Sequence, residues 1–185
     1  MMESILDEAR EKMEKAIEAL QGELATIRTG RASPALVERL GVEYYGVPTP
    51  LNQIASISAP EAHLLVIRPW DEGALPEIER AIRKSDLGLT PVNDGHIIRL
   101  AVPHLTEERR RELVRLVGRR LEEARVAIRN LRRETINDLK ELEREKMISQ
   151  DDLYRNRDEV QKLTDEYIEK VAQLGQAKEE EIMEF

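Results

Sequence analysis

One apolar pattern extends over roughly forty residues and limits the folds open to this chain. From Thr106 to about Lys146 the apolar positions recur at a mean step of about 3.6 residues, the period of an α-helix. They are Leu113, Val117, Leu121, Ala124, Ile128, Leu131, Thr135, Leu139 and Leu142. At 1.5 Å per residue such a helix is about 60 Å long. Because its apolar stripe must be covered along that length, the pattern favours a bundle of long helices.

Two further segments have matching stripes. Residues 3–27 show apolar side chains at three- and four-residue steps, and the pattern stops at Thr29-Gly30, a common helix end. The other helix follows a predicted N-terminal cap at 149–152. Its stripe consists of Leu153, Val160, Leu163, Tyr167, Val171 and Leu174. We therefore predict a three-helix bundle built from residues 1–30 and 104–185.

The middle of the chain, residues 31–103, has a different character. Short patterns rich in β-branched residues predict strands at 42–47, 54–58, 64–67 and 96–102. Pro48-Thr49-Pro50 is expected to break the first strand, and Asp71 to cap a helix that runs to about Lys84. The predicted fold class is α+β, an elongated three-helix bundle with an inserted small β/α/β domain. The two connections between the inserted domain and the bundle, near 30–31 and 103–105, lie side by side in this topology. We predict that they form a hinge, which consists of Gly30, Arg31, Pro103, His104 and Leu105.

Charge is distributed unevenly along the chain. The net charge is −8, yet residues 109–133 contain 10 Arg and only 3 Glu. On a helical wheel several of these side chains form a solvent-facing ridge, away from the apolar stripe. The ridge comprises Arg111, Arg115, Arg125, Arg129, Arg132 and Arg133. Guanidinium groups donate paired hydrogen bonds to phosphate, so the ridge indicates contact with an RNA backbone.

The alternative for the Arg ridge is a solvated helix face with salt bridges between residues three or four apart. The small number of Glu residues on the ridge argues against it. Interleaved aromatic residues are absent, so base stacking is not indicated.

Patterns typical of an active site are missing from the sequence. There is no Cys, which excludes disulfides and thiolate metal sites, and His63, His96 and His104 lack metal-ligand spacing. Neither a phosphate-binding Gly loop nor a Gly-x-Ser-x-Gly elbow occurs. We expect no enzyme activity, no metal and no cofactor. No apolar run has transmembrane length and the N-terminus does not look like a secretory signal, so we expect a cytoplasmic protein without membrane or DNA partners.

Six motifs, in order along the whole chain, resemble the bacterial ribosome recycling factor family. They are Arg-Thr-Gly-Arg-Ala-Ser-Pro at 28–34, Val-Glu-Tyr-Tyr-Gly-Val-Pro-Thr-Pro-Leu at 42–51, Ser-Asp-Leu-Gly-Leu at 85–89, Leu-Thr-Glu-Glu-Arg-Arg at 105–110, Ala-Arg-Val-Ala-Ile-Arg-Asn-Leu-Arg-Arg at 124–133 and Val-Gln-Lys-Leu-Thr-Asp at 160–165. The resemblance implies an L-shaped monomer that binds the large ribosomal subunit of the post-termination complex. It also implies that elongation factor G is the partner whose GTP hydrolysis drives subunit separation.

The same resemblance implies which side chains contact ribosomal RNA. The contacts transfer first to Arg129 and Arg132. Four more positions follow, namely Arg28, Arg31, Arg110 and Arg133. Two other function classes remain as alternatives. A strict 3.5-residue repeat would favour a helical scaffold or interaction protein. A nucleotide or metal site would favour an RNA-modifying enzyme. The sequence shows neither pattern.

Overall fold

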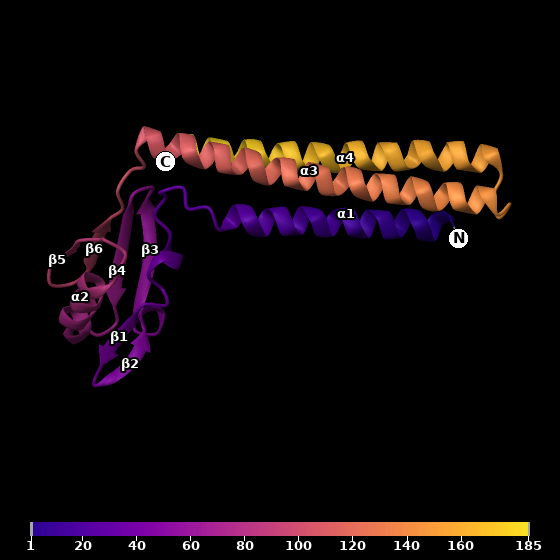
Figure 1. The fold of residues 1–185 in the computed structure, drawn as a ribbon. Coiled ribbons are helices and arrows are strands. Elements are labelled where there is room, and N and C mark those ends of the chain that lie inside the picture. Colours follow the sequence, from indigo (N-terminus) through magenta and orange to yellow (C-terminus); the bar gives the residue numbers. More distant parts are fainter. Residues whose placement is uncertain (1, 185) are drawn as a thin grey trace. The chain divides into compact units, whose positions relative to one another are not determined.

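The computed structural model describes residues 2–184 and divides into two compact units. One consists of residues 2–28 and 107–184, and the other of residues 29–106 (Figure 1). Met1 and Phe185, the two ends of the predicted bundle, lie outside the described residues. No helix among the described residues is both long and apolar enough to cross a membrane.

The first unit is a bundle of three long helices that lie side by side (Figure 1). They are α1 (Met2–Ala25), α3 (Glu107–Arg144) and α4 (Gln150–Glu184). The predicted apolar stripe of α3 is buried along most of its length, with only Leu131 and Leu142 half-buried. The prediction of three helices with one shared core is therefore confirmed.

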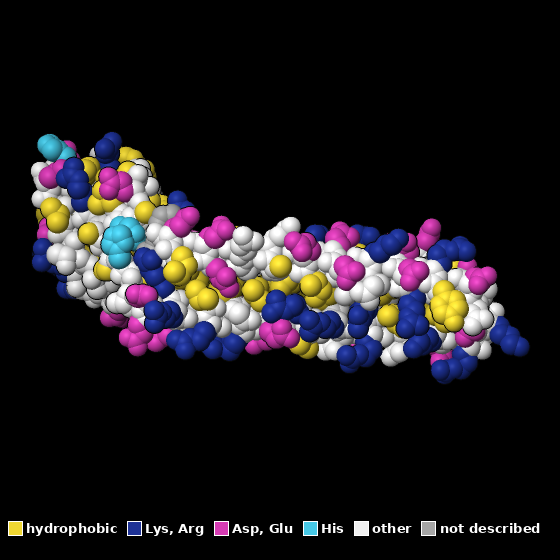
Figure 2. All heavy atoms as spheres, turned by 90° about the horizontal axis from the view of Figure 1, so that it is seen from above, with side chains coloured by type: hydrophobic (Ala, Val, Ile, Leu, Met, Phe, Trp, Pro, Cys, Tyr) yellow, Lys and Arg dark blue, Asp and Glu magenta, His cyan; other side chains and the backbone are white. Residues whose placement is uncertain are grey.

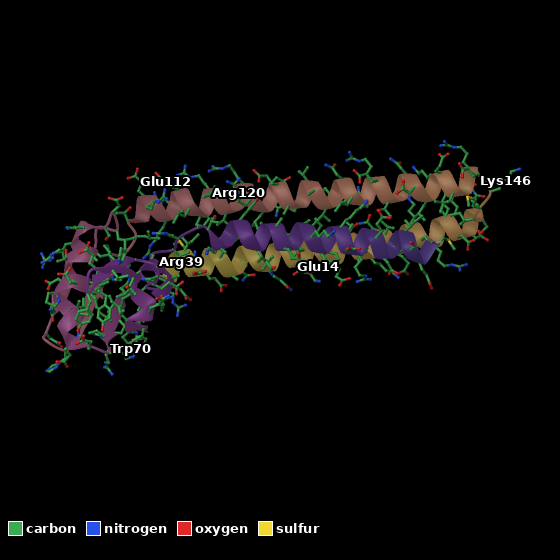
Figure 3. All side chains as sticks on the ribbon, turned by 90° about the horizontal axis from the view of Figure 1, so that it is seen from below. Glu14, Arg39, Trp70, Glu112, Arg120 and Lys146 are labelled. Atoms are coloured by element: carbon green, nitrogen blue, oxygen red, sulfur yellow. The ribbon has the colours of Figure 1, made fainter. Side chains whose placement is uncertain are left out.

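The turn between α3 and α4 is closed by a reciprocal cap. Asp152 N donates to Ser149 Oγ at 3.0 Å, and Ser149 N donates to Asp152 Oδ2 at 3.2 Å. Each side chain thereby satisfies a backbone N–H that the first turn of α4 leaves without a helical partner. The predicted cap at 149–152 is confirmed, and Lys146 marks this end of the bundle in Figure 3.

Two contacts fix how α4 packs in the bundle. Tyr167, which is buried, donates its hydroxyl to Glu14 Oε2 of α1 at 2.8 Å. Against α3, Gly175 leaves room for the Leu121 side chain, because a Cβ atom at Gly175 would overlap Leu121 Cδ1. Such contacts set the register between helices, which the period of a single helix does not specify.

The second unit is a small α+β domain. Four antiparallel strands form a sheet in the order β3-β4-β6-β5, and α2 (Leu75–Lys84) contributes Leu75, Ile78 and Ile82 to the core of the unit. A separate two-stranded hairpin precedes the sheet. The strands are β1 (Gly41–Tyr44), β2 (Val47–Pro50), β3 (Ala55–Glu61), β4 (Leu64–Pro69), β5 (Pro91–Asn93) and β6 (Ile98–Ala101).

Asp71 connects the hairpin to the segment before α2. The predicted cap is present, but it serves a short 3-10 turn at Glu72–Ala74, where Gly73 N donates to Asp71 Oδ1 at 2.9 Å. Asp71 Oδ2 also accepts from the Tyr45 hydroxyl at 2.8 Å. This hydrogen bond is the main cause of the lowered pKa of the Asp71 carboxyl. Trp70 beside it is largely exposed (Figure 3).

Two strand predictions were wrong. Pro48 and Pro50 do not break a strand but belong to β2, which pairs with β1 after a turn at Tyr45-Gly46. A two-stranded hairpin leaves one side of β2 unpaired, where the missing proline N–H is tolerated. Residues 91–93, where no strand was predicted, form β5 at the edge of the sheet, where three residues suffice to pair with β6.

Candidate RNA-binding face of the helical bundle

The predicted Arg ridge lies on the outer surface of α3. Arg111, Arg115, Arg129 and Arg133 are exposed, whereas Arg125 and Arg132 are half-buried. Figure 2 shows Lys and Arg side chains along the length of the bundle on the face drawn, interspersed with Asp and Glu. The apolar stripe of α3 faces α1 and α4, so the helix separates its basic and apolar faces as the periodicity predicts.

The expectation that these Arg residues lack carboxylate partners was wrong for half of the ridge. Arg111 pairs with Glu107 at 2.8 Å, and Glu122 pairs with both Arg125 at 2.9 Å and Arg129 at 3.5 Å. Glu122 lies on the ridge itself, seven residues before Arg129. The ridge is therefore partly a salt-bridged face up to Arg129.

Beyond Arg129 the surface changes. A groove of about 320 Å³ lies between α3 and α4. Its lining residues are Arg132, Arg133, Ile136, Asn137, Lys140, Arg157, Asp158 and Gln161. Arg132 of α3 donates from Nη1 to Gln161 Oε1 of α4 at 3.2 Å, and both residues line the groove. The structure thus brings two predicted site residues, Arg132 and Arg133, into one basic groove, with Arg129 one turn before them on α3.

Two basic residues of the groove were missed by the sequence analysis. Lys140 lies seven residues after Arg133, about 20° from it on a helical wheel. Its place on the same face of α3 was therefore predictable from the sequence. Arg157 is on α4, and nothing in the sequence indicates that it faces Arg132 and Arg133 across the groove.

The other predicted RNA-binding residues lie elsewhere. Arg110 is 22 positions before Arg132 on α3, about 33 Å along the helix. It donates from Nη1 to the Met183 carbonyl at 2.8 Å, which satisfies an acceptor in the last turn of α4. Its Nε is buried without a hydrogen-bond partner among the described residues. Arg28 and Arg31 are exposed, and the chain passes from the first unit to the second between them. Within the bundle, the distance from Arg110 to Arg132 means that the predicted residues form no single compact site.

The predicted hinge residues flank points where the chain is held to the second unit. Ala32 N donates to the Ala62 carbonyl at 2.6 Å. Val102 N donates at 2.8 Å to the carbonyl of His63, which directly follows Ala62 in the chain. The His104 ring lies against His63, with 3.5 Å between the ring centroids and an angle of 39° between the ring planes. Gly30 has a φ of 78°, a left-handed conformation that favours glycine. Both connections are therefore anchored at one turn, between β3 and β4.

The described residues include no group of three or more His, Asp or Glu side chains placed to hold a metal ion. The geometry consists instead of a partly salt-bridged Arg ridge that leads into a basic groove, an arrangement suited to an extended anion.

Comparison with known proteins decides the family. The model of the family described as "Ribosome recycling factor" matches residues 20–183. The chain belongs to the ribosome recycling factor family. Members of this family are non-enzymatic translation factors, in agreement with the expectation that the chain is not an enzyme.

Relatives in the ribosome recycling factor family match over their whole length. The ribosome-recycling factor of Carboxydothermus hydrogenoformans is 59% identical over 183 residues, which is 99% of each chain. That of Bacillus subtilis is 55% identical and is covered completely. A solution structure of a ribosome recycling factor is 49% identical, with a TM-score of 0.68 over 100% of this chain and 98% of that one.

A second solved structure shows a family member in a larger assembly. It contains models of the Thermus thermophilus ribosome recycling factor and the Escherichia coli elongation factor G bound to the E. coli post-termination complex. Its matched chain is 50% identical, with a TM-score of 0.60 over 98% of both chains.

Proposed function

We propose that this protein recycles ribosomes in the cytoplasm: it binds the large subunit of the post-termination complex and, with elongation factor G and GTP, promotes subunit splitting and release from mRNA. The observation that supports this most strongly is the family match along nearly the whole chain. A relative 50% identical has been placed with elongation factor G on that complex. The family match favours this function over a helical scaffold protein.

In this proposal the basic face of α3 provides affinity for ribosomal RNA. Phosphate contacts from Arg129, Arg132 and Arg133 position the bundle without reading base sequence. Arg28, Arg31 and Arg110 contribute further contacts. The protein acts as a monomer and hydrolyses nothing itself. The bundle is a stiff lever because its helices share one buried core, and the two connections near residues 30–31 and 103–105 allow the second unit to move against it.

The test is a splitting assay with purified components. Post-termination ribosomes are mixed with the protein, cognate elongation factor G and GTP, and subunit separation is followed by light scattering. We expect the scattering to fall only when all components are present. A GTP analogue that resists hydrolysis serves as the control and should prevent the fall. Ribosomes that stay intact in the complete mixture would contradict the proposal.

A further inference from the structure

The groove between α3 and α4 differs from the rest of the Arg ridge in its charge balance. Its lining contains four basic side chains, Arg132, Arg133, Lys140 and Arg157, and among the described lining residues Asp158 is the single carboxylate. None of these four basic groups forms an ion pair with another described residue. On the earlier part of the ridge, by contrast, Arg111, Arg125 and Arg129 are each paired with a Glu side chain. Arg115 is the one ridge residue before Arg129 that forms no ion pair with a described residue, so unpaired positive charge is denser in the groove than on the earlier ridge.

Nearby carboxylates on α3 are directed elsewhere. The pKa of Lys12 on α1 is raised, mainly by its hydrogen bond to Glu8. The negative charges of Glu134 and Asp138 on α3 raise it further, so both carboxylates lie near Lys12. They therefore face α1, and α3 supplies no carboxylate to the groove. The groove contains four positive charges and one carboxylate among its described lining residues, so its net positive charge attracts an anion.

Arg132 is held ready for such an anion. Its hydrogen bond to Gln161 fixes one end of the guanidinium, and Gln161 is itself held, since its Nε2 donates to Asp165 Oδ1 at 2.9 Å. Arg132 Nε is buried without a hydrogen-bond partner among the described residues. Because its guanidinium is already held in place, Arg132 loses little conformational freedom when it binds an anion through its remaining N–H groups.

The ligand that fits is a phosphodiester backbone. Phosphate oxygens accept the paired hydrogen bonds that a guanidinium donates, and the groove is open and lies between two long helices. None of the described residues that line it is aromatic, so bases have no stacking partner there. We infer that Lys140 and Arg157 bind the RNA backbone together with Arg132 and Arg133, so that the RNA-binding surface extends from α3 onto α4. This inference rests on the proposed function.

The test compares charge variants of exposed groove residues with a matched control. Arg157→Gln and Lys140→Gln each remove one positive charge from the groove, and Asp158→Asn removes its carboxylate. Arg155→Gln is the control, because Arg155 is an exposed Arg on the same helix, two residues from Arg157, that does not line the groove. Arg132→Gln is the reference for loss of binding. Affinity for isolated large ribosomal subunits is measured over a series of KCl concentrations, and circular dichroism checks that each variant is folded.

We expect Arg157→Gln and Lys140→Gln to weaken binding several-fold and to lower the slope of log affinity against log salt by about one, as loss of a phosphate contact does. Asp158→Asn should tighten binding, a result that a purely structural role would not give. Arg155→Gln should match the wild type. If Arg132→Gln weakens binding while Arg157→Gln and Lys140→Gln behave like the control, the inference is wrong and the proposed function stands. A wild-type protein that does not bind large subunits would overturn both.

Discussion

At the scale of single residues, neighbouring charged side chains in this protein have very different surroundings. Arg129 is paired with Glu122, whereas Arg133, four residues later, has no carboxylate partner among the described residues. Exposed ion pairs of the first kind contribute little to stability. The difference matters for binding, because the carboxylate partner of a paired Arg offsets its positive charge. The partner also occupies N–H groups that would otherwise donate to phosphate.

One carboxylate in the second unit makes a pH dependence testable. In the turn between β5 and β6, Asp94 Oδ1 accepts from the backbone N–H groups of Ile97 and His96 at 2.9 Å each, and Arg99 bonds to Oδ2 at 2.9 Å. These contacts lower the pKa of Asp94 from 3.8 to about 2, and the hydrogen bond from the Ile97 backbone N–H makes the largest contribution. A lowered folded-state pKa gives stability that is present above the ordinary pKa and is lost as the pH falls toward the folded value.

We therefore expect the thermal midpoint to fall between about pH 4 and pH 2 partly because Asp94 is protonated. Asp94→Asn keeps the acceptor oxygen but does not titrate, so its midpoint should depend less on pH over this window. The other carboxylates titrate in both proteins, and the difference between the two curves isolates Asp94. Parallel curves would contradict the assignment, and an NMR titration of the carboxyl measures its pKa directly.

At the scale of elements, the packing of α3 against α4 depends on a missing side chain. In an exposed helix Ala is more favourable than Gly by about 1 kcal/mol. At Gly175 an added methyl group would overlap the Leu121 side chain, which is buried. We expect Gly175→Ala to destabilise the bundle by about 1–2 kcal/mol, measured by urea unfolding, because overpacking outweighs helix propensity.

A double-mutant cycle tests whether Leu121 is the cause. Leu121→Ala removes the atoms that the new methyl group would meet, although it leaves a cavity of its own. The double variant should be more stable than the sum of the two single changes predicts, by about 1 kcal/mol. A stabilising Gly175→Ala would show that the helices tolerate the methyl group.

At the scale of the whole molecule, the two units are joined by two short connections that are anchored at one turn. Ala32 and Val102 bond to the adjacent carbonyls of Ala62 and His63. In the proposed mechanism, force applied to one unit reaches the other through these connections. Restricting them should therefore affect splitting and leave binding intact.

A reducible cross-link tests this separation. The chain has no Cys, so Thr26→Cys and Ala35→Cys provide two unique thiols, both exposed, on either side of residues 28–31. We expect the cross-linked protein to bind large subunits like the wild type but to fail in the splitting assay, and reduction to restore splitting. Each single variant controls for the substitutions. Full splitting activity of the cross-linked protein would exclude motion at this connection as part of the mechanism.

Local patterns in the sequence determined the helices and the basic face. The stripe from Leu113 to Leu139 and the cap at Ser149 depend on residues a few positions apart, and a helix repeats its geometry every few residues whatever surrounds it. The Arg ridge is visible for the same reason. The motifs determined the family. Short strands such as 48–50 and 91–93 were misread because a strand at an edge is defined by its partner, which local sequence does not show.

Only the tertiary structure decided where side chains from different elements meet. That Arg157 faces Arg132 depends on the register of α4 against α3, and that register is set by distant contacts such as Gly175 with Leu121 and Tyr167 with Glu14. The same holds for the two connections anchored at Ala62 and His63. Helical periodicity gives the angle of each side chain about its own axis, but not the position of that axis beside another.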